Sequence, residues 1–412
     1  MKKEVEELIR ILAKEEQKKE LLKEMIKVEI RSMVKELLEE VALVEREAFC
    51  ESQGEAKNGF YPRDIEGFFG PVEDIKIPRT REGGFKPFFI RPYRKASYEI
   101  EELVIAMYQG GCSTRDVTRT MEILLEHRYS ASWVSRMTDA VHEKVETFRK
   151  RKIELWYPIV FLDGVVLKIR RDSVAGEVVY IALGIGEDGY KEVLGFWIVG
   201  AEGESALVWK DILAELKERG LEEPLLFVGD GLKGLDQAVK EIYPLADFQS
   251  CILHKVRNSL SKVRKKHREA IAEDLQQVYQ QRDESGFKQA LTVFCQEWRL
   301  LYPEVTKSWE RELPYLMTYL SYPEELRPFI YTTNILERFI KEVRRRAKVI
   351  EVFPHPDATG KVMYLVAAEM NERYKRRLLR NWDRINDKLK SIRMVKYGNK
   401  AMVDAFCLTQ NS

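Results

Sequence analysis

Two aspartates belong to predicted buried strands, and each precedes a glycine. One is expected inside its strand and the other at the carboxyl end of its strand. Asp163 lies in VFLDGVV, and Asp230 lies in LLFVGDG. An unpaired charge among such apolar residues is costly, so each carboxylate must reach water or hold a cation. Ligands of open α/β sheets bind at the carboxyl ends of the strands, where Asp230 is expected. Two acids at the ends of neighbouring strands repel each other, so the pattern predicts a divalent cation.

A third carboxylate should come from a helix packed beside these strands, and Glu337 is the best candidate. It stands in YTTNILERFIKEVRRR, one turn after Asn334, which we expect to cap the helix. Mg²⁺ takes oxygen ligands, and two such ions can clamp a phosphate during in-line attack. We therefore predict two Mg²⁺ ions at Asp163, Asp230 and Glu337, with Mn²⁺ as a substitute. Each acid alone is typical of a turn or a helix start, so the prediction depends on all three.

Cys251 and His254 form a Cys-x-x-His motif directly after a predicted short strand. A structural zinc ion needs four ligands and the motif offers two, so we expect no zinc. Cys251 is instead expected to be buried as a small apolar side chain. His254, Arg257 and Asn258 are expected to face the active cleft or DNA. The sequence has no Walker-type phosphate loop and no nucleophile elbow, which argues against NTP hydrolysis and against a serine or cysteine hydrolase.

The acids need a sheet to position them, and the pattern after residue 157 supplies one. Three segments rich in Val, Ile and aromatic residues, joined by short turn-like links, predict antiparallel strands. A helix, a buried strand, a second helix and a short strand follow. This order predicts an α/β fold of the ribonuclease-H-like type. The predicted strands are residues 159–169, 178–186, 193–199, 225–228 and one near Phe248, and the helices are 205–219 and 232–242.

Residues 252–330 are amphipathic and predict an inserted, wholly helical subdomain. Two more helices, from Asn334 and from Ala358, lead to a basic tail. Positive charge is concentrated here, because residues 252–282 hold eight Lys and Arg against three Asp and Glu, and residues 331–393 hold sixteen against eight. Such stretches favour a polyanionic partner. Arg344, Arg345 and Arg346 are predicted to contact DNA.

Three short helices are predicted within residues 97–150, with a tight Gly110–Gly111 turn after the first. The arrangement is typical of a helix-turn-helix, whose last helix enters the major groove. Any three-helix bundle can show the same pattern, so a purely structural role stays open. The predicted DNA contacts are Ser113, Thr114, Arg115, Ser132, Ser135 and Arg136.

Residues 49–96 are rich in Gly and Pro, which we expect to break any regular element. Basic and aromatic residues alternate in IKIPRTREGGFKPFFIRPYRK, a composition that suits an arm along a phosphate backbone. Arg79, Arg91 and Arg94 are its predicted DNA contacts. The alternative is an irregular segment packed on a neighbouring part of the chain.

Residues 1–48 predict helix, with an apolar series at steps of three or four. Two interpretations remain open for this series. It packs within its own domain as a helical hairpin, or it meets a second copy and forms a dimer. The series is Leu22, Ile26, Ile30, Met33, Leu37, Val41 and Val44.

Composition excludes several classes of protein. With 412 residues, 45% of them hydrophobic and 33% charged, the chain has material for two or three folded domains and is not disordered as a whole. Five scattered cysteines fit a reducing compartment rather than a disulfide scaffold. The sequence shows neither a signal peptide nor a run of apolar residues long enough for a membrane span. We expect a soluble, cytoplasmic protein.

Between about residues 60 and 400 the chain carries, in order, the blocks FLDGVVLKIR, IALGIGEDGYKEVLGFW, GDGLKGL, QSCILHKVRNSL and YPEELRPFIYTTNILERFIKEVRRR. This series resembles the Mutator-type insertion-sequence transposases of bacteria. The resemblance implies a ribonuclease-H-like catalytic domain with a helical insertion and an Asp-Asp-Glu triad, here Asp163, Asp230 and Glu337. One position departs from the family, since relatives commonly have Asn where this chain has Ile340.

The expected activity is therefore metal-dependent cleavage and joining of double-stranded DNA at terminal inverted repeats and at a target, by a homodimer or larger assembly associated with the nucleoid. A nuclease without end joining and a DNA-binding regulator are the rival functions. Six segments are predicted: a helical region (1–48), a basic arm (49–96), a helix-turn-helix-like domain (97–152), the first catalytic part (153–251), the insertion (252–330), and the last catalytic part with the tail (331–412).

Overall fold

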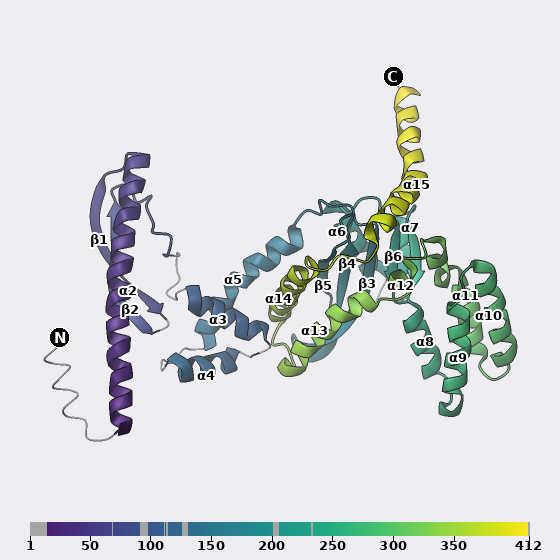
Figure 1. Cartoon of the computed structure of the whole chain (residues 1–412), viewed down its shortest axis with the longest axis horizontal. Coiled ribbons are helices and arrows are strands. Elements are labelled where there is room, and N and C mark those ends of the chain that lie inside the picture. The colour runs from purple at the N-terminus through teal and green to yellow at the C-terminus, as the bar shows by residue number, and fades with distance from the viewer. Residues whose placement is uncertain are drawn as a thin grey trace. The chain divides into compact units, whose positions relative to one another are not determined.

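The computed structural model of the chain is a mixed α/β protein (Figure 1) and describes residues 15–67, 69–90, 98–110, 112, 114–125, 131–200, 206–231 and 234–410. It divides into two compact units, Met1–Ala140 and Val141–Ser412. Within the described residues, no helix combines the length and the apolar character that crossing a membrane requires.

The second unit is built on a five-stranded mixed sheet with the strand order β5-β4-β3-β6-β7. Strands β3, β4 and β5 pair antiparallel through short turns, β6 pairs with β3 in parallel, and β7 pairs with β6 in parallel. Parallel neighbours require crossovers, which two helices provide. The strands are β3 (Ile159–Arg170), β4 (Val174–Ile185), β5 (Lys191–Ile198), β6 (Leu226–Gly229) and β7 (Asp247–Ser250).

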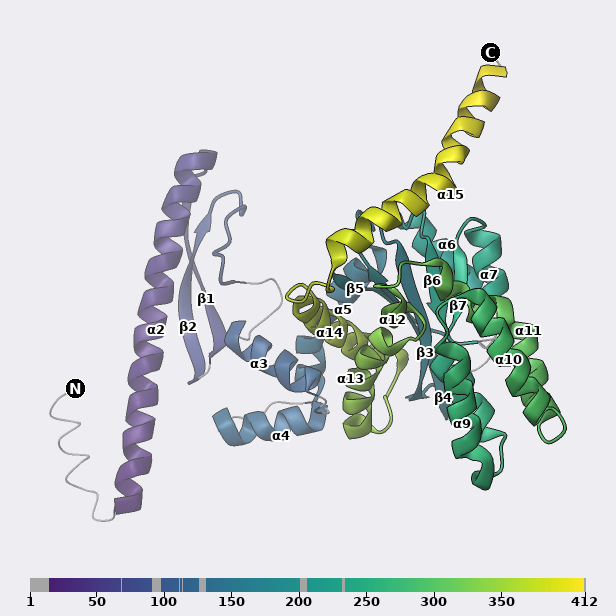
Figure 2. The ribbon, with the colours of Figure 1, turned by 45° about the vertical axis from the view of Figure 1, so that its right-hand side comes forward.

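Helices cover both faces of this sheet (Figure 2). The crossover helices α6 (Ala206–Glu218) and α7 (Leu235–Ile242) share one core with Val160 and Leu162 of β3. Because side chains alternate along a strand, the fully buried Phe161 points to the other face. Helices α13 (Asn334–Ile350) and α14 (Pro356–Tyr374) contact β3, and the long α15 (Trp382–Gln410) follows them.

Helices also make up the segment between β7 and α13. Its core includes Phe287, Phe294 and Trp309, all nearly inaccessible to solvent. The helices are α8 (Ile252–Ser261), α9 (Arg268–Tyr279), α10 (Glu284–Trp298), α11 (Pro303–Leu316) and α12 (Arg327–Ile330), with 3₁₀ turns η1 (Lys265–His267) and η2 (Thr318–Ser321).

In the first unit, the prediction that residues 49–96 contain no regular element is wrong. Helix α2 (Glu15–Gln53) is followed by an antiparallel hairpin of β1 (Lys57–Gly67) and β2 (Gly70–Thr80). Two of the expected breakers, Gly67 and Gly70, flank the turn. The prolines fit because each strand of a two-stranded sheet is an edge strand. Alternating apolar residues pack against Val34 and Leu38 of α2.

Three helices complete the first unit: α3 (Tyr98–Gln109), α4 (Thr114–Leu125) and the start of α5 (Ala131–Lys150). Ile100, Val104, Val117 and Met121 form a small buried cluster between α3 and α4. The boundary between the two units falls inside α5, after Ala140. The last turns of α5 belong to the second unit, where Phe148 stacks on Phe196 of β5.

Candidate active site

The pairing of β3 with β6 places the two aspartates side by side. Leu162 pairs with Gly229, so Asp163, within β3, and Asp230, directly after the end of β6, lie next to each other. Each carboxylate accepts a hydrogen bond of 2.7 Å from the backbone N–H of the glycine that follows it. The Asp-Gly steps recognised in the sequence therefore form a matched pair at one point of the sheet.

Asp163 is the more buried of the two acids, with only 6% of its surface exposed. Burial raises the pKa of its carboxyl group to about 6. The positive charge of His254 and the hydrogen bond from Gly164 oppose this rise, while Asp230 and Glu337 add to it. The three acids are therefore close enough to interact electrostatically, although they come from distant parts of the sequence.

Glu337 reaches the aspartates from the first turn of α13, which runs along β3. An acid at this position also complements the helix dipole. Its Oε1 accepts a hydrogen bond of 2.7 Å from the exposed guanidinium of Arg257. Thr333, not Asn334 as predicted, occupies the N-cap position of α13, and Asn334 is the first helical residue.

His254 lies between the acids. Its Nδ1 is 3.8 Å from Asp230 Oδ1, and its Nε2 is 3.6 Å from Glu337 Oε1. A hydrogen bond with Cys251 and then the charges of Cys251, Asp230 and Asp163 raise the pKa of His254 to about 9, against the effect of burial. At neutral pH an imidazolium and the Arg257 guanidinium therefore partly neutralise the three carboxylates.

The oxygen atoms of the three acids are suitable ligands for a divalent cation, but the distances between the acids are too large for them to bind one together in this conformation. Among the described residues, no three His, Cys, Asp or Glu side chains are grouped closely enough to hold a metal ion as they stand. His254 and Arg257 engage Glu337 instead. The three acids offer the hard oxygen ligands that Mg²⁺ prefers, and their mutual repulsion favours a cation among them.

Cys251 is buried at the N-cap position of α8. Its sulfur accepts hydrogen bonds from the backbone N–H and the hydroxyl of Thr333, at 3.3 Å and 3.4 Å. The hydroxyl also lies 3.4 Å from His254 Nδ1. Thr333, to which no sequence pattern pointed, links the Cys-x-x-His motif to the start of the helix that carries Glu337.

A second residue that sequence analysis missed is Lys255, which follows His254 and pairs with Glu312 rather than with one of the three acids. It is 8% exposed, and its Nζ pairs with Glu312 of α11 at 2.6 Å and donates to the carbonyl of Ser308. The pair ties α8, the helix of His254, to α11 within the helical insertion. A lysine among the apolar positions of α8 was the only signal for it in the sequence.

The residues predicted to contact DNA differ in how exposed they are. Arg346 is a wrong prediction, because it is 4% exposed and pairs with Glu342 and Glu369. Arg79 lies over the ring of Tyr61 in the hairpin. Ser113, Arg91 and Arg94, and the side chains of Ser132, Ser135 and Arg136, lie outside the described part of the chain. Exposed side chains are those of Arg115, Arg257, Asn258, Arg344 and Arg345, and Thr114 is half-buried.

Another group of cations involves the residue after Glu337. Arg338, on α13, and Arg377, beyond α14, both act on Lys191 at the start of β5. Burial and these two positive charges lower the pKa of Lys191.

Ile340, one turn after Glu337, is 3% exposed and belongs to the core.

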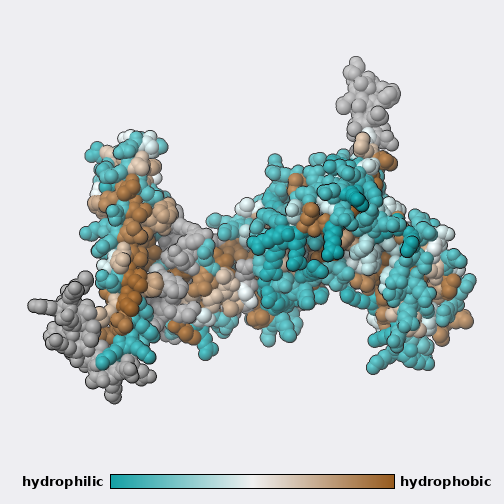
Figure 3. Space-filling model, viewed as in Figure 1, coloured by the Kyte–Doolittle hydropathy of each residue, from teal (hydrophilic) through white to brown (hydrophobic). Residues whose placement is uncertain are grey.

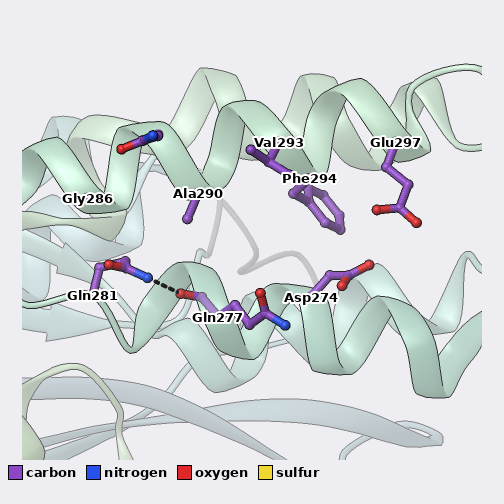
Figure 4. Close-up of a pocket in the computed structure, with 9 residues that line it drawn as sticks. Asp274, Gln277, Gln281, Gly286, Ala290, Val293, Phe294 and Glu297 are labelled. Atoms are coloured by element: carbon purple, nitrogen blue, oxygen red, sulfur yellow. Dashed lines mark hydrogen bonds between the residues drawn. The ribbon is translucent and has the colours of Figure 1, made fainter.

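A pocket of about 260 Å³ lies between α9 and α10 of the insertion (Figure 4). Its lining carries no Lys or Arg and none of the three acids discussed above. An acidic and amide-rich surface does not suit a phosphate group, so we do not assign the reaction to it. The lining includes Asp274, Gln277, Gln281, Ala290, Phe294 and Glu297.

Comparison with known proteins gives a consistent picture. Residues 1–377 match a family model described as "Transposase, Mutator family". The chain is 35% identical over 341 residues to the transposase for insertion sequence element IS905 of Lactococcus lactis, covering 83% of this chain and 86% of the relative. It is 36% identical over 304 residues to that of ISRM3 from Rhizobium meliloti (73% and 76%), and 28% identical over 333 residues to that of IS256 in transposon Tn4001 from Staphylococcus aureus (79% and 83%).

Proposed function

The chain belongs to the Mutator family of transposases, and from this premise we propose that it binds the terminal inverted repeats of a transposable element and catalyses Mg²⁺-dependent DNA cleavage and strand transfer. The observation that carries the proposal is the convergence of Asp163, Asp230 and Glu337 around His254. The strand order supports the proposal that the catalytic part is ribonuclease-H-like, since three antiparallel strands are followed by two parallel ones.

In this proposal Asp163, Asp230 and Glu337 hold two Mg²⁺ ions. When bound, such ions activate the attacking hydroxyl and stabilise the charge on the phosphodiester. The chain's own residues prepare the site. Asp163 and Asp230 are fixed by the sheet register and by their glycine N–H bonds. Glu337 must exchange its contacts with Arg257 and His254 for the ions, which releases both cationic side chains toward the DNA phosphates.

Two reactions follow at the same site. Water attacks the phosphodiester at the transposon end, and the bond to the 3′ oxygen breaks to leave a 3′-OH. That hydroxyl then attacks a target phosphodiester, so one P–O bond forms as another breaks. We propose that the helices α3 to α5 recognise the ends. Binding to phosphates should fall steeply with salt, with a log–log slope of roughly −0.9 per contact.

A supercoiled plasmid that carries the cognate ends tests the proposal when it is incubated with the protein and Mg²⁺. Joined or circularised products support a transposase. Cleavage without joining would indicate a nuclease, and retardation without any strand cut would indicate a DNA-binding regulator. Either of these outcomes contradicts the proposal.

The pair between Arg257 and Glu337 leads to a prediction about metal dependence. Arg257→Ala removes a cation that competes for Glu337, so less Mg²⁺ should be needed for half-maximal cleavage. An exposed ion pair contributes at most about 1 kcal/mol, so we expect a decrease of up to about fivefold. The measurement is a Mg²⁺ titration of plasmid cleavage at saturating DNA.

The matched control is Arg264→Ala, because Arg264 is also exposed in the same basic stretch but does not pair with Glu337. Its Mg²⁺ requirement should equal that of the unaltered protein. If Arg257→Ala left the requirement unchanged or raised it, the pair would not compete with the metal.

A further inference from the structure

Helix α2 carries large apolar side chains in contact with solvent. Five members of the series recognised in the sequence are about half or more exposed: Leu22 (55%), Ile26 (49%), Met33 (63%), Leu37 (59%) and Val44 (63%). Figure 3 shows a brown, hydrophobic band on the surface along α2. The apolar stripe, as we call Leu22, Ile26, Ile30, Met33, Leu37, Val41 and Val44, is larger than the single exposed apolar residues that monomers commonly show.

The stripe is distinct from the face of α2 that packs on the hairpin. Val34 and Leu38 contact the hairpin core, and Ala42 is fully buried. At 100° per residue, the centres of the two faces lie about 110° apart around the helix. The hairpin therefore accounts for one apolar face of α2 and leaves the other without an explanation.

The spacing of the stripe suits a long helical partner. Its members follow one another at steps of 4, 4, 3, 4, 4 and 3 residues. This 11-residue repeat stays close to the natural period of an α-helix, so the stripe runs nearly straight along α2. It extends over roughly 33 Å, which matches another helix of similar length better than a small ligand.

Charge along α2 is divided between its two halves. Residues 18–31 contain five Lys or Arg residues and three Asp or Glu residues, so this half is positively charged. Residues 32–47 contain two Lys or Arg residues and five Asp or Glu residues, so that half is negatively charged. Lys18 and Lys19 are exposed near one end of the stripe, and Glu40 and Glu47 are exposed near the other. An antiparallel copy would therefore bring opposite charges together, and a parallel copy would bring like charges together.

We propose that α2 pairs antiparallel with α2 of a second copy of this chain through the apolar stripe. Met33 lies midway between Leu22 and Val44, so in this orientation two Met33 side chains meet at the centre and each Leu22 lies opposite Val44 of the other copy. A strip about 33 Å long and about 10 Å wide is smaller than a standard interface, which indicates a dimer that forms at micromolar concentration. The pairing does not depend on the chemistry of the acidic site.

Sedimentation velocity of the full chain without DNA tests the proposal across a range of about 1 to 50 μM, where we expect a concentration-dependent dimer. Met33→Glu places two carboxylates against each other at the centre of the interface, and we expect it to weaken the dimer at least about tenfold. Val28→Glu is the matched control, because Val28 is 55% exposed on the same helix but lies off the stripe. It should change the dimer constant by less than about twofold.

Orientation is tested by cross-linking of engineered cysteines. In a mixture of Leu22→Cys and Val44→Cys proteins, antiparallel pairing should give the mixed disulfide, and parallel pairing should give only like-with-like disulfides. The unaltered chain, which has a cysteine at Cys50 of α2, measures the background. A monomer at all concentrations, equal effects of Met33→Glu and Val28→Glu, or like-with-like disulfides would each overturn the proposal. DNA cleavage by the same samples shows separately whether the proposed function stands.

Discussion

Asp230→Asn is expected to abolish strand cleavage and joining while binding to the DNA ends is retained. Asp230 directly follows β6 and lies next to Asp163 of β3, and its charge interacts with both Asp163 and His254. The amide keeps the shape of the side chain and the acceptor for the Gly231 N–H, so the turn should survive. It removes the anion on which cation binding depends. The loss should be on the order of 10²- to 10³-fold, as is usual when one main electrostatic element of a site is removed.

The measurement pairs plasmid cleavage in Mg²⁺ with an end-binding assay on the same protein. Asp172→Asn is the control, because Asp172 is an exposed acid in the turn between β3 and β4 and should tolerate the change. Cleavage retained by Asp230→Asn would remove this residue from the site. Loss of both cleavage and end binding would point to misfolding, which the circular dichroism spectrum would reveal.

Asp163→Asn is expected to have opposite effects on activity and stability. It should abolish cleavage for the same reason as the change at Asp230. In the metal-free protein, however, burial raises the pKa of Asp163 from 3.8 to about 6, so the ionised carboxylate is unfavourable in the folded state. A neutral amide avoids this cost and still accepts the Gly164 N–H. The gain in the free energy of unfolding above pH 7 should approach about 3 kcal/mol, the equivalent of about two pKa units.

The stability difference between Asp163→Asn and the unaltered chain should depend on pH in a defined direction. A carboxyl group whose pKa is raised on folding stabilises the protein fully only below its unfolded pKa, and this contribution is lost as the pH rises through its folded value. The difference between Asp163→Asn and the unaltered chain should therefore be largest above pH 7 and vanish below about pH 4. Urea unfolding followed by tryptophan fluorescence measures it, because six of the seven tryptophans lie in residues 141–412.

Asp172→Asn again serves as the control, since an exposed acid should show no such difference at any pH. Equal stability of the Asp163→Asn and unaltered proteins at pH 8 would mean that the carboxylate is compensated by its neighbours. Added Mg²⁺ offers a second readout. It should raise the melting temperature of the unaltered chain and leave that of the variant nearly unchanged, because ligand binding stabilises only the state that binds.

Much of the second unit could be predicted from the sequence. The strands of the sheet lie within a few residues of their predicted positions, and the antiparallel pairs joined by short turns are confirmed. Runs of Val and Ile with turn residues between them are a local signal that tertiary structure rarely overrides. The hairpin of residues 57–80 was not predicted, because glycine and proline were interpreted only as residues that break regular structure. Proline is also tolerated in edge strands, and glycine is compatible with the tight turn that joins them.

By itself, the sequence determined which residue types were present to do chemistry and at which strand and helix ends they stood. Asp163, Asp230 and Glu337 could be selected because an acid among apolar residues needs a reason to be there. Only the tertiary structure decided which partners these segments take, since Arg257 reaches Glu337, and Thr333 reaches Cys251 and His254, across 79 to 82 residues of chain. Packing likewise withdrew Arg346 from solvent and left the apolar stripe of α2 outside the core. Local patterns record what a residue prefers, whereas its partners depend on which distant segments fold against it.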